Sequence, residues 1–362
     1  MSTILADGIE VDVEEIRDVA RRLLADRVDR RAPYAEPPRN EARALFLSMA
    51  ELGWTQLTLP EEVGGLGLSF TALAPIYEEM GKAVAPVALF PTLASLELLA
   101  SPQASADARS LCPAIVGGEV KLAVAFTPQG RAAVREGQAE LAALSIPADP
   151  DTSHLLLLEE GGAAWLVDLA AAGATVRQPE MWDRSRPVID IVLESAPAIA
   201  ATVGDPAEPI ARVRGHLDLA LAWDSLGGAR QSLEETIGYM LTRQQFGRQI
   251  GSFQALKHRA ADHKVAVEVA TAFAREATGA FARQAPEAAV RAAQARILAN
   301  DAYHAMAEDA VQLHGGIGFT WEHDCHLFLK RALLNEMLFE TPEARRDRLA
   351  AVLFDRVRDQ QH

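Results

Sequence analysis

Cysteine is scarce in this sequence, and its two cysteines are not arranged as a pair. Cys112 and Cys325 stand far apart in a chain of 362 residues, and no CxxC spacing occurs. Disulfide frameworks and zinc sites need several cysteines at characteristic spacings, so neither is expected here. The predicted compartment is a reducing one, the cytoplasm.

Basic side chains are also in short supply. The sequence has 35 lysines and arginines against 50 acidic residues, which gives a net charge of −15. Proteins that bind nucleic acid gain most of their affinity from basic patches. Anionic membrane surfaces likewise attract clusters of lysine and arginine. The charge balance therefore argues against both kinds of partner.

Long apolar runs are missing as well. No stretch reaches the length of about 20 apolar residues that a membrane helix needs, and the leucine run Leu155 to Leu158 is short and flanked by acids. The first residues, Met1 to Glu15, are acidic and lack the basic start and apolar run of a signal peptide. Neither a membrane span nor a signal peptide is expected.

What the sequence does contain is enough apolar material for two or three packed units, since 49% of its residues are hydrophobic. Residues 1–120 are predicted to form an N-terminal helical domain. Apolar residues on one face indicate a helix from Glu41 to Leu52. A glycine-rich turn at residues 59–68 then leads into a helix from about Ser69, a plausible N-cap, to Met80.

The middle of the chain, residues 121–207, changes character. Short apolar or alternating runs are separated there by proline, glycine and aspartate, which is typical of strands joined by turns. These runs are Lys121 to Phe126, Leu155 to Glu159, Ala164 to Asp168 and Val188 to Glu194. The pattern predicts a small β-sandwich or barrel.

Residues 208–362 are predicted to form a C-terminal bundle of four helices. The first spans Ile210 to Arg243, and Ser252 is a candidate cap for the second. The third begins at Pro286 and Glu287, where proline suits the first turn. Thr341 is a good N-cap for the last helix. The predicted fold class is mainly α with a central β domain.

Two stretches of the bundle region are unusual. Residues 312–318 read Gln-Leu-His-Gly-Gly-Ile-Gly, and residues 243–254 read Arg-Gln-Gln-Phe-Gly-Arg-Gln-Ile-Gly-Ser-Phe-Gln. Glycines without a Cβ let the backbone approach a ligand closely. Taken alone, Gly315 is also explained as an ordinary helix C-cap. The two stretches together favour a binding site.

With these stretches, the order of helices, β domain and helical bundle resembles the acyl-CoA dehydrogenase family over nearly the whole chain. The resemblance is strongest at residues 243–250, 252–254, 257–259 and 312–319, and the loop at residues 60–67 fits the family's N-terminal domain. It implies FAD as cofactor and an acyl-CoA thioester as substrate. It also implies a dimer of dimers, of one or two kinds of chain, with an electron-transfer flavoprotein as electron acceptor.

The resemblance also implies roles for residues around FAD. Arg243 would meet the diphosphate, because a guanidinium fork suits paired phosphate oxygens. Phe246 would pack near the adenosine half. Three glutamines, Gln245, Gln254 and Gln312, are assigned to the same region, and Gly315 and Gly316 would let the backbone come close. Each residue alone has an ordinary structural explanation. No metal ligand set is expected, and His323 with His326 lacks a third ligand.

The candidate general base is Glu340, which would remove the α-proton of the thioester while hydride passes to flavin N5. In much of the family the base follows an aromatic residue before the last helix, as Glu340 follows Phe339. The alternative is an acid that stabilises the helix N-terminus, a role that Glu343 already fills. The second base position known in relatives falls near Leu217, which cannot serve. Asp224 is expected to be a polar or capping residue.

The β domain departs from flavin-binding relatives. The segment Thr127-Pro128-Gln129-Gly130 matches only the beginning of their ring-binding motif, and no Trp-x-Thr or Trp-x-Ser follows in the expected strand. This pattern is similar to the shorter subunits of heterotetrameric acyl-CoA dehydrogenases, in which two unlike chains share each FAD. Three functions stay open: an active dehydrogenase, a subunit that completes a partner's FAD site, and an inactive structural homologue.

Several other features have ordinary readings. Trp165 is expected in a strand core and Trp182 in a turn, while His314 would hydrogen-bond a carbonyl at the helix end. Arg345, Arg346 and Arg348 are expected on the solvated face of the last helix. Short, branched, aromatic and steroid side-chain thioesters all remain candidate substrates.

Overall fold

The structure is a computed structural model that describes residues 2–4, 10–36, 41–127, 133–159 and 162–359. Its segments gather into two compact units. The first comprises Met1–Val13, Arg31–Leu73 and Pro86–Leu217, and the second comprises Glu14–Arg30, Ala74–Ala85 and Asp218–His362. No helix in these ranges combines the length and hydropathy of a membrane span.

The first unit combines short helices with a sheet. Its helices are α2 (Ala42–Glu51), α4 (Leu89–Leu99), α5 (Ala106–Ser110) and α6 (Cys112–Val116), with 3-10 turns η1 (Ala32–Tyr34), η2 (Glu61–Val63) and η3 (Phe70–Ala72). A small antiparallel pair is formed by β1 (Ser2–Ile4) and β2 (Glu10–Asp12). Helix α4 is apolar on almost every face, which explains why nearly all of its residues are buried.

The larger sheet of this unit has the strand order β3-β6-β7-β9-β5-β4, with β8 paired to β9. Its strands are β3 (Leu122–Thr127), β4 (Val134–Arg135), β5 (Gln138–Pro147), β6 (His154–Glu159), β7 (Ala163–Asp168), β8 (Ala174–Arg177) and β9 (Val188–Ala200). Strands β3 and β6 are parallel, and the other pairs are antiparallel. The long β9 joins the sheet's two parts, because it pairs with β5 and β8 first and with β7 at its end.

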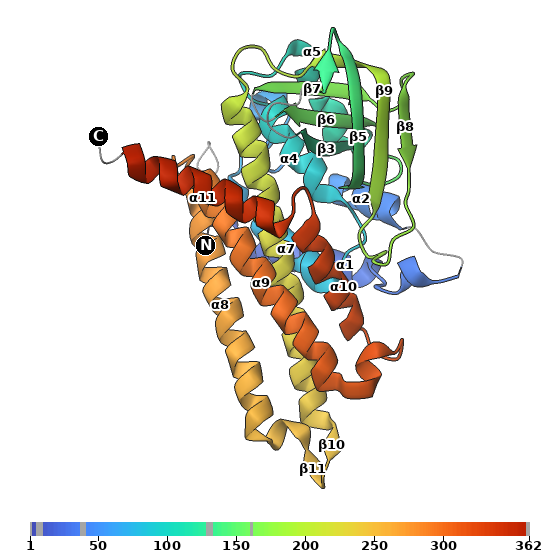
Figure 1. Cartoon of the computed structure of the whole chain (residues 1–362), viewed down its shortest axis with the longest axis vertical. Coiled ribbons are helices and arrows are strands. Elements are labelled where there is room, and N and C mark those ends of the chain that lie inside the picture. Colours follow the sequence, from blue (N-terminus) through green and yellow to red (C-terminus); the bar gives the residue numbers. More distant parts are fainter. Residues whose placement is uncertain (1, 5–9, 37–40, 128–132, 160–161, 360–362) are drawn as a thin grey trace. The chain divides into compact units, whose positions relative to one another are not determined.

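The second unit consists of helices. Helix α7 (Ala207–Thr242) belongs to it from Asp218 onward. The other helices are α1 (Val13–Arg27), α3 (Ala74–Ala83), α8 (Gln254–Ala282), α9 (Ala288–His314), α10 (Cys325–Met337) and α11 (Pro342–Asp359). Figure 1 shows α8 and α9 as long neighbouring helices, and their ribbons run side by side. The order of helices, central sheet and helices confirms the predicted fold class.

Glycines allow α3 and α7 to pack backbone against backbone in this unit. A Cβ on Gly81 would lie 1.9 Å from the Asp224 carbonyl oxygen, and one on Gly227 would lie 1.9 Å from that of Glu78. Real Cβ atoms do not come this close to oxygen, so both positions require glycine. Asp224 itself accepts hydrogen bonds from Asn335 (2.7 Å) and Arg331 (3.3 Å) of α10, which agrees with its predicted role as a polar residue.

One of the three N-caps expected from the sequence was correctly predicted from neighbouring residues alone. Thr341 caps α11 as predicted, because its Oγ1 accepts the Ala344 N–H at 3.2 Å. Ser252 and Ser69 were wrong as caps. The Ser252 hydroxyl donates to the Gln249 carbonyl, while Ser69 pairs with the Thr71 hydroxyl before a 3-10 turn. The three predicted domains stay a prediction, since the two compact units are defined by contacts in space.

Candidate functional site

A short β-hairpin carries the arginine-rich stretch at the end of α7. Strands β10 (Gln244–Gln245) and β11 (Arg248–Gln249) pair, and the turn between them consists of Phe246 and Gly247. Both turn residues have positive φ, 52° and 76°, as a tight hairpin turn of the primed type requires. This turn holds Phe246 at the hairpin tip with 91% of its surface exposed. Figure 1 shows the hairpin where α7 ends and α8 begins.

Arg243 stands at the base of this hairpin with a fixed backbone and an unengaged side chain. Its N–H donates to the Tyr239 carbonyl at 2.8 Å, and its own carbonyl accepts the Ile250 N–H at 2.9 Å. The side chain is exposed, and within the described ranges no ion pair holds its guanidinium. A guanidinium in this state can bind an anion from outside the chain.

The glycine loop follows α9 directly. Gly315 has φ 63° and ψ −140°, a conformation that favours glycine, and its N–H donates to the Gln312 carbonyl. A Cβ added at Gly315 or Gly316 would have no atom of the protein within 4 Å. At Gly318, by contrast, a Cβ would lie 2.6 Å from the Val311 carbonyl oxygen. Packing within the chain thus explains Gly318, whereas the bare backbone at Gly316 faces open space.

The hairpin base and the glycine loop meet through an aromatic contact. The rings of Tyr239 and His314 stack with centroids 4.4 Å apart, and the Tyr239 hydroxyl donates to the His314 carbonyl at 3.4 Å. Arg243 lies one helical turn beyond Tyr239, and Gly315 follows His314. The structure therefore brings Arg243 and the glycine loop to the same end of the second unit.

The glutamines lie at this end too. Gln254 opens α8, and Gln312 lies in the last turn of α9. These two helix ends are held together because Arg259 and His263 of α8 both contact Asp309 of α9. Gln245, Gln254 and Gln312 are exposed, so their amides can reach a bound molecule. A guanidinium, an aromatic ring, free amides and a bare backbone together fit the adenosine diphosphate half of a dinucleotide.

Glu340 lies elsewhere in the same unit and is tightly engaged. Its side chain is only 12% exposed, and its two oxygens accept hydrogen bonds from the Nη2 (2.6 Å) and Nε (3.2 Å) atoms of Arg348. The Nε atom of Arg345 lies 3.5 Å away. Proton abstraction by Glu340 would require this fork to open first. Its assignment as the base stays a prediction.

Asp218 of α7 completes a charge cluster around Glu340. Its carboxylate lies 3.0 Å from Arg296 and 3.6 Å from Arg348. Burial raises the pKa of Asp218, but the nearby arginines outweigh burial and hold this pKa below its ordinary value. Burial also lowers the pKa of Arg345 to about 10. The expectation that Arg345 and Arg348 form a solvated face was therefore wrong, because both join a largely buried cluster.

Arg346 meets that expectation, since it is exposed and pairs with Asp301 at the surface. Leu217, next to the second base position, is buried.

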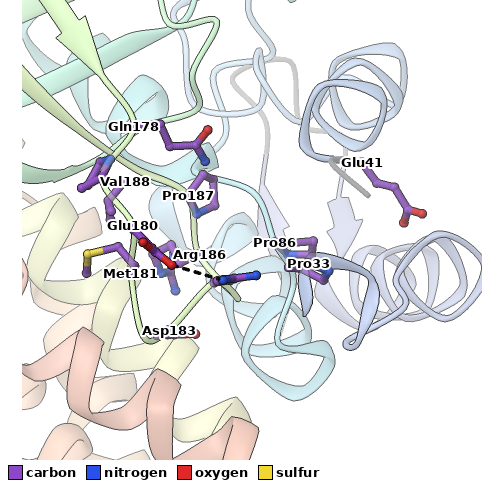
Figure 2. A pocket seen from close by; sticks show the side chains of 12 residues that line it. Pro33, Glu41, Pro86, Gln178, Glu180, Met181, Asp183, Arg186, Pro187 and Val188 are labelled. Atoms are coloured by element: carbon purple, nitrogen blue, oxygen red, sulfur yellow. Dashed lines mark ion pairs between the residues drawn. The ribbon is translucent and has the colours of Figure 1, made fainter. Parts of the chain in front are cut away.

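The first unit has a cavity of its own that the sequence did not reveal. Its volume is about 550 Å³, and Figure 2 shows it beside the loop before β9. Asp183 accepts hydrogen bonds there from the Tyr34 hydroxyl (2.9 Å) and the Ser185 N–H (2.7 Å). The Arg186 guanidinium lies over the Phe90 ring at 4.6 Å. No pattern around residues 182–186 indicated more than a turn, because the cavity walls come from distant segments.

Three described residues, Thr127, Trp165 and Trp182, bear on the flavin-ring motif considered from the sequence. Thr127 ends β3 and is buried, while Pro128, Gln129 and Gly130 lie outside the described residues. Trp165 packs against the apolar core of the sheet, as predicted. Trp182 lies in the loop between β8 and β9 and is 66% exposed.

Comparison with known proteins adds independent findings. A family model described as the acyl-CoA dehydrogenase N-terminal domain matches residues 11–103, and one described as the C-terminal domain matches residues 216–354. The acyl-CoA dehydrogenase IpdE2 of Mycolicibacterium smegmatis is 32% identical over 360 residues, covering 94% of this chain and 100% of that protein. The protein of the same name from Mycobacterium tuberculosis is 33% identical over 296 residues, covering 81% and 80%.

Among solved structures, the ChsE4-ChsE5 complex from Mycobacterium tuberculosis contains a similar chain. Its TM-score is 0.83 at 21% identity, and the match covers 94% of this chain and 96% of that one. This likeness concerns the fold.

Proposed function

Because the chain belongs to the acyl-CoA dehydrogenase family, we propose that it serves the α,β-dehydrogenation of an acyl-CoA thioester as one subunit of a hetero-oligomer. The family consists of FAD-dependent oxidoreductases that act on CH–CH groups. In this proposal the chain completes the adenosine side of an FAD whose ring is held by a longer partner subunit. FAD supplies the acceptor for the hydride that leaves the β-carbon.

The observation that carries the proposal is the contrast between two groups of residues. Arg243 is exposed without an ion pair in the described ranges, at the base of the hairpin and at the same end of the unit as the bare glycine loop. Glu340, the candidate base, is held by the Arg348 fork at 2.6 and 3.2 Å. The adenosine-side residues are therefore available to a ligand, whereas the base is already engaged.

Each residue of the exposed end has a role in this proposal. Arg243 binds the diphosphate, where a planar fork matches two phosphate oxygens. Phe246 covers the adenosine ring system, and Gly315 and Gly316 let backbone N–H groups approach the phosphates. The amides of Gln245, Gln254 and Gln312 donate and accept hydrogen bonds around the sugar and base.

The assembly in this proposal is a dimer of dimers that passes its electrons to an electron-transfer flavoprotein. The substrate is the CoA thioester of a fatty acid or of a steroid side chain. The support for a hetero-oligomer is a structural likeness, since one neighbour is described as a complex of two named chains, ChsE4 and ChsE5.

A second candidate function is an active dehydrogenase without a partner, with Glu340 as the base. It is favoured by the place of Glu340 after the aromatic Phe339 and one residue before Thr341, the cap of α11. In this case the Arg348 fork opens when substrate binds.

The deciding experiment measures FAD content and thioester oxidation in the chain alone and after co-expression with a longer homologue. We expect little flavin in the chain alone and bound FAD with activity in the complex. Arg243→Ala should lower the FAD content of the complex about tenfold or more, since a charge-assisted contact is lost. Arg275→Ala, at an exposed arginine of α8, is the matched control. A chain that binds FAD and oxidises thioesters alone would contradict the proposal.

A further inference from the structure

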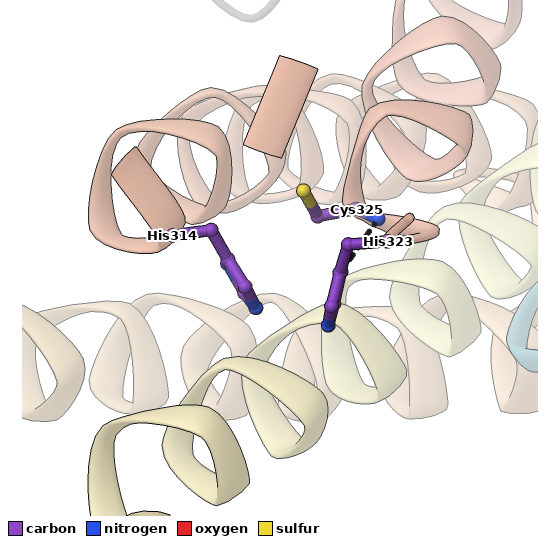
Figure 3. A group of neighbouring side chains, drawn as sticks. All are labelled: His314, His323 and Cys325. Carbon is purple, nitrogen blue, oxygen red and sulfur yellow. Dashed lines mark hydrogen bonds between the residues drawn. The ribbon is translucent and has the colours of Figure 1, made fainter. Parts of the chain in front are cut away.

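We propose that His314, His323 and Cys325 form a binding site for a divalent metal ion of the Zn²⁺ type. His314 ends α9, His323 lies in the turn after η5 (Gly315–Phe319), and Cys325 begins α10. One ligand atom from each residue lies within 4.8 Å of the other two. Figure 3 shows the imidazole rings of His314 and His323 side by side, with Cys325 next to them at the start of α10.

His314 carries the strongest signal. Its side chain belongs to a residue only 3% exposed, and Nδ1 lies 2.7 Å from the Ala310 carbonyl oxygen, to which it can only donate. The neutral ring therefore keeps its lone pair on Nε2. That buried Nε2 atom has no hydrogen-bond partner among the described residues. Histidine ligands commonly donate one ring N–H to a carbonyl while the other nitrogen binds the metal.

The ring contacts of His314 have a simpler explanation as packing, since its ring stacks on Tyr239 at 4.4 Å and lies tilted against His323 at 4.1 Å between centroids. Packing accounts for the ring positions, yet it leaves a buried nitrogen unsatisfied, which costs free energy in a folded protein. A metal ion bound to Nε2 would satisfy this atom. The neighbouring His323 and Cys325 would supply the other two protein ligands.

Cys325 and His323 can adapt with small movements. The Cys325 thiol donates to the Gly318 carbonyl at 3.3 Å, and the Cys325 backbone N–H donates to Nδ1 of His323 at 3.1 Å. On metal binding the thiol proton leaves to solvent, and His323 takes its other tautomer and gives up this hydrogen bond. Ligand atoms of a tetrahedral zinc site lie about 3.5 Å apart, so the side chains close in by about 1 Å.

Two histidines and one thiolate are a ligand set that Zn²⁺ accepts, with water in the fourth position. His323 is half-buried, which leaves a side from which water can enter. No metal site was predicted from the sequence, because His323 was paired there with His326 and no third ligand stood nearby. The fold instead combines His323 with residues from the end of α9 and the start of α10.

Residues 315–319 of the glycine loop lie between His314 and His323 along the chain, so two ligands of the proposed site flank this loop. A bound ion would tie the end of α9, this loop and α10 together. Its consequence for FAD rests on the proposed function, but metal binding itself does not.

The test uses the full chain after treatment with a chelator and dialysis. We expect it to bind about one equivalent of Zn²⁺ in a calorimetric titration with zinc chloride. Co²⁺ in place of Zn²⁺ should give a thiolate-to-cobalt charge-transfer absorption. Cys325→Ser should abolish this band, and His323→Gln should weaken binding about tenfold or more.

The controls replace a histidine and a cysteine that lie outside the proposed site. His326→Gln and Cys112→Ser should bind both ions like the unchanged chain. Far-ultraviolet circular dichroism shows whether each variant folds. Because His323 is only half-buried, its replacement disturbs the packed core less than replacement of His314 would. Absence of zinc binding, or equal binding by folded His323→Gln and Cys325→Ser, would overturn the proposal.

Discussion

At the scale of single residues, charged partners hold the Glu340 carboxylate in place. Arg348 contacts both of its oxygens, and Arg345 and the Asp218–Arg296 pair lie beside them. A charged side chain that is largely buried needs such partners, because desolvation without them is costly. No local pattern predicted this cluster, since Asp218 and Arg348 lie on helices far apart along the chain.

Glu340→Gln distinguishes a structural from a catalytic role. We expect the complex with a partner to keep its kcat within about tenfold, because the partner supplies the base. The variant should lose about 1–3 kcal/mol of unfolding free energy, since Arg348 loses its charged acceptor. Asp347→Asn, at an exposed acid beyond the first turn of α11, is the control. A loss of about 100-fold or more in kcat with unchanged stability would identify Glu340 as the base.

At the scale of elements, the hairpin and the glycine loop show what sequence patterns could and could not predict. The helix start at Thr341 was predictable because a cap needs only neighbouring residues. The hairpin β10–β11 was not, because each strand has two residues and its turn begins with Phe246, an unusual residue at φ 52°. The glycine loop was predicted as a ligand contact, but its link to the hairpin through Tyr239 and His314 is tertiary.

The two glycines of this loop can be separated by mutation. Gly315→Ala should lower the unfolding free energy by about 1–3 kcal/mol, because φ 63° with ψ −140° strains any other residue. Gly316 has an ordinary φ and open space around it, so Gly316→Ala should leave chemical denaturation nearly unchanged. In the complex the same Gly316→Ala should reduce bound FAD, because the new Cβ stands where the cofactor approaches. Unchanged flavin content would argue against that approach.

At the scale of the whole molecule, the proposed diphosphate site at Arg243 belongs to a chain that is acidic on average. A net charge of −15 repels a diphosphate at long range, although salt at physiological strength screens this effect beyond about 8 Å. In the proposed site Arg243 would contact the diphosphate directly, at a distance where screening by salt matters less. The net charge therefore argued against nucleic acid as a partner in the sequence prediction, but it could not locate the residues that would hold a nucleotide cofactor.

Large exposed rings gather at the same end of the second unit. Phe246 is 91% exposed and Phe319 is 81% exposed, values that are unfavourable for such rings in water. If a partner with its FAD covers this end, amide hydrogen exchange of residues 243–253 and 312–321 should slow markedly in the complex. The amides of β8, in the other unit, provide an internal reference that should change little.

Exchange measured by mass spectrometry on the chain alone, the flavin-free complex and the FAD-loaded complex would separate the partner's contribution from that of the cofactor. Unaltered exchange in both segments across all three samples would show that this end stays open to water, and the proposed adenosine site would then be wrong.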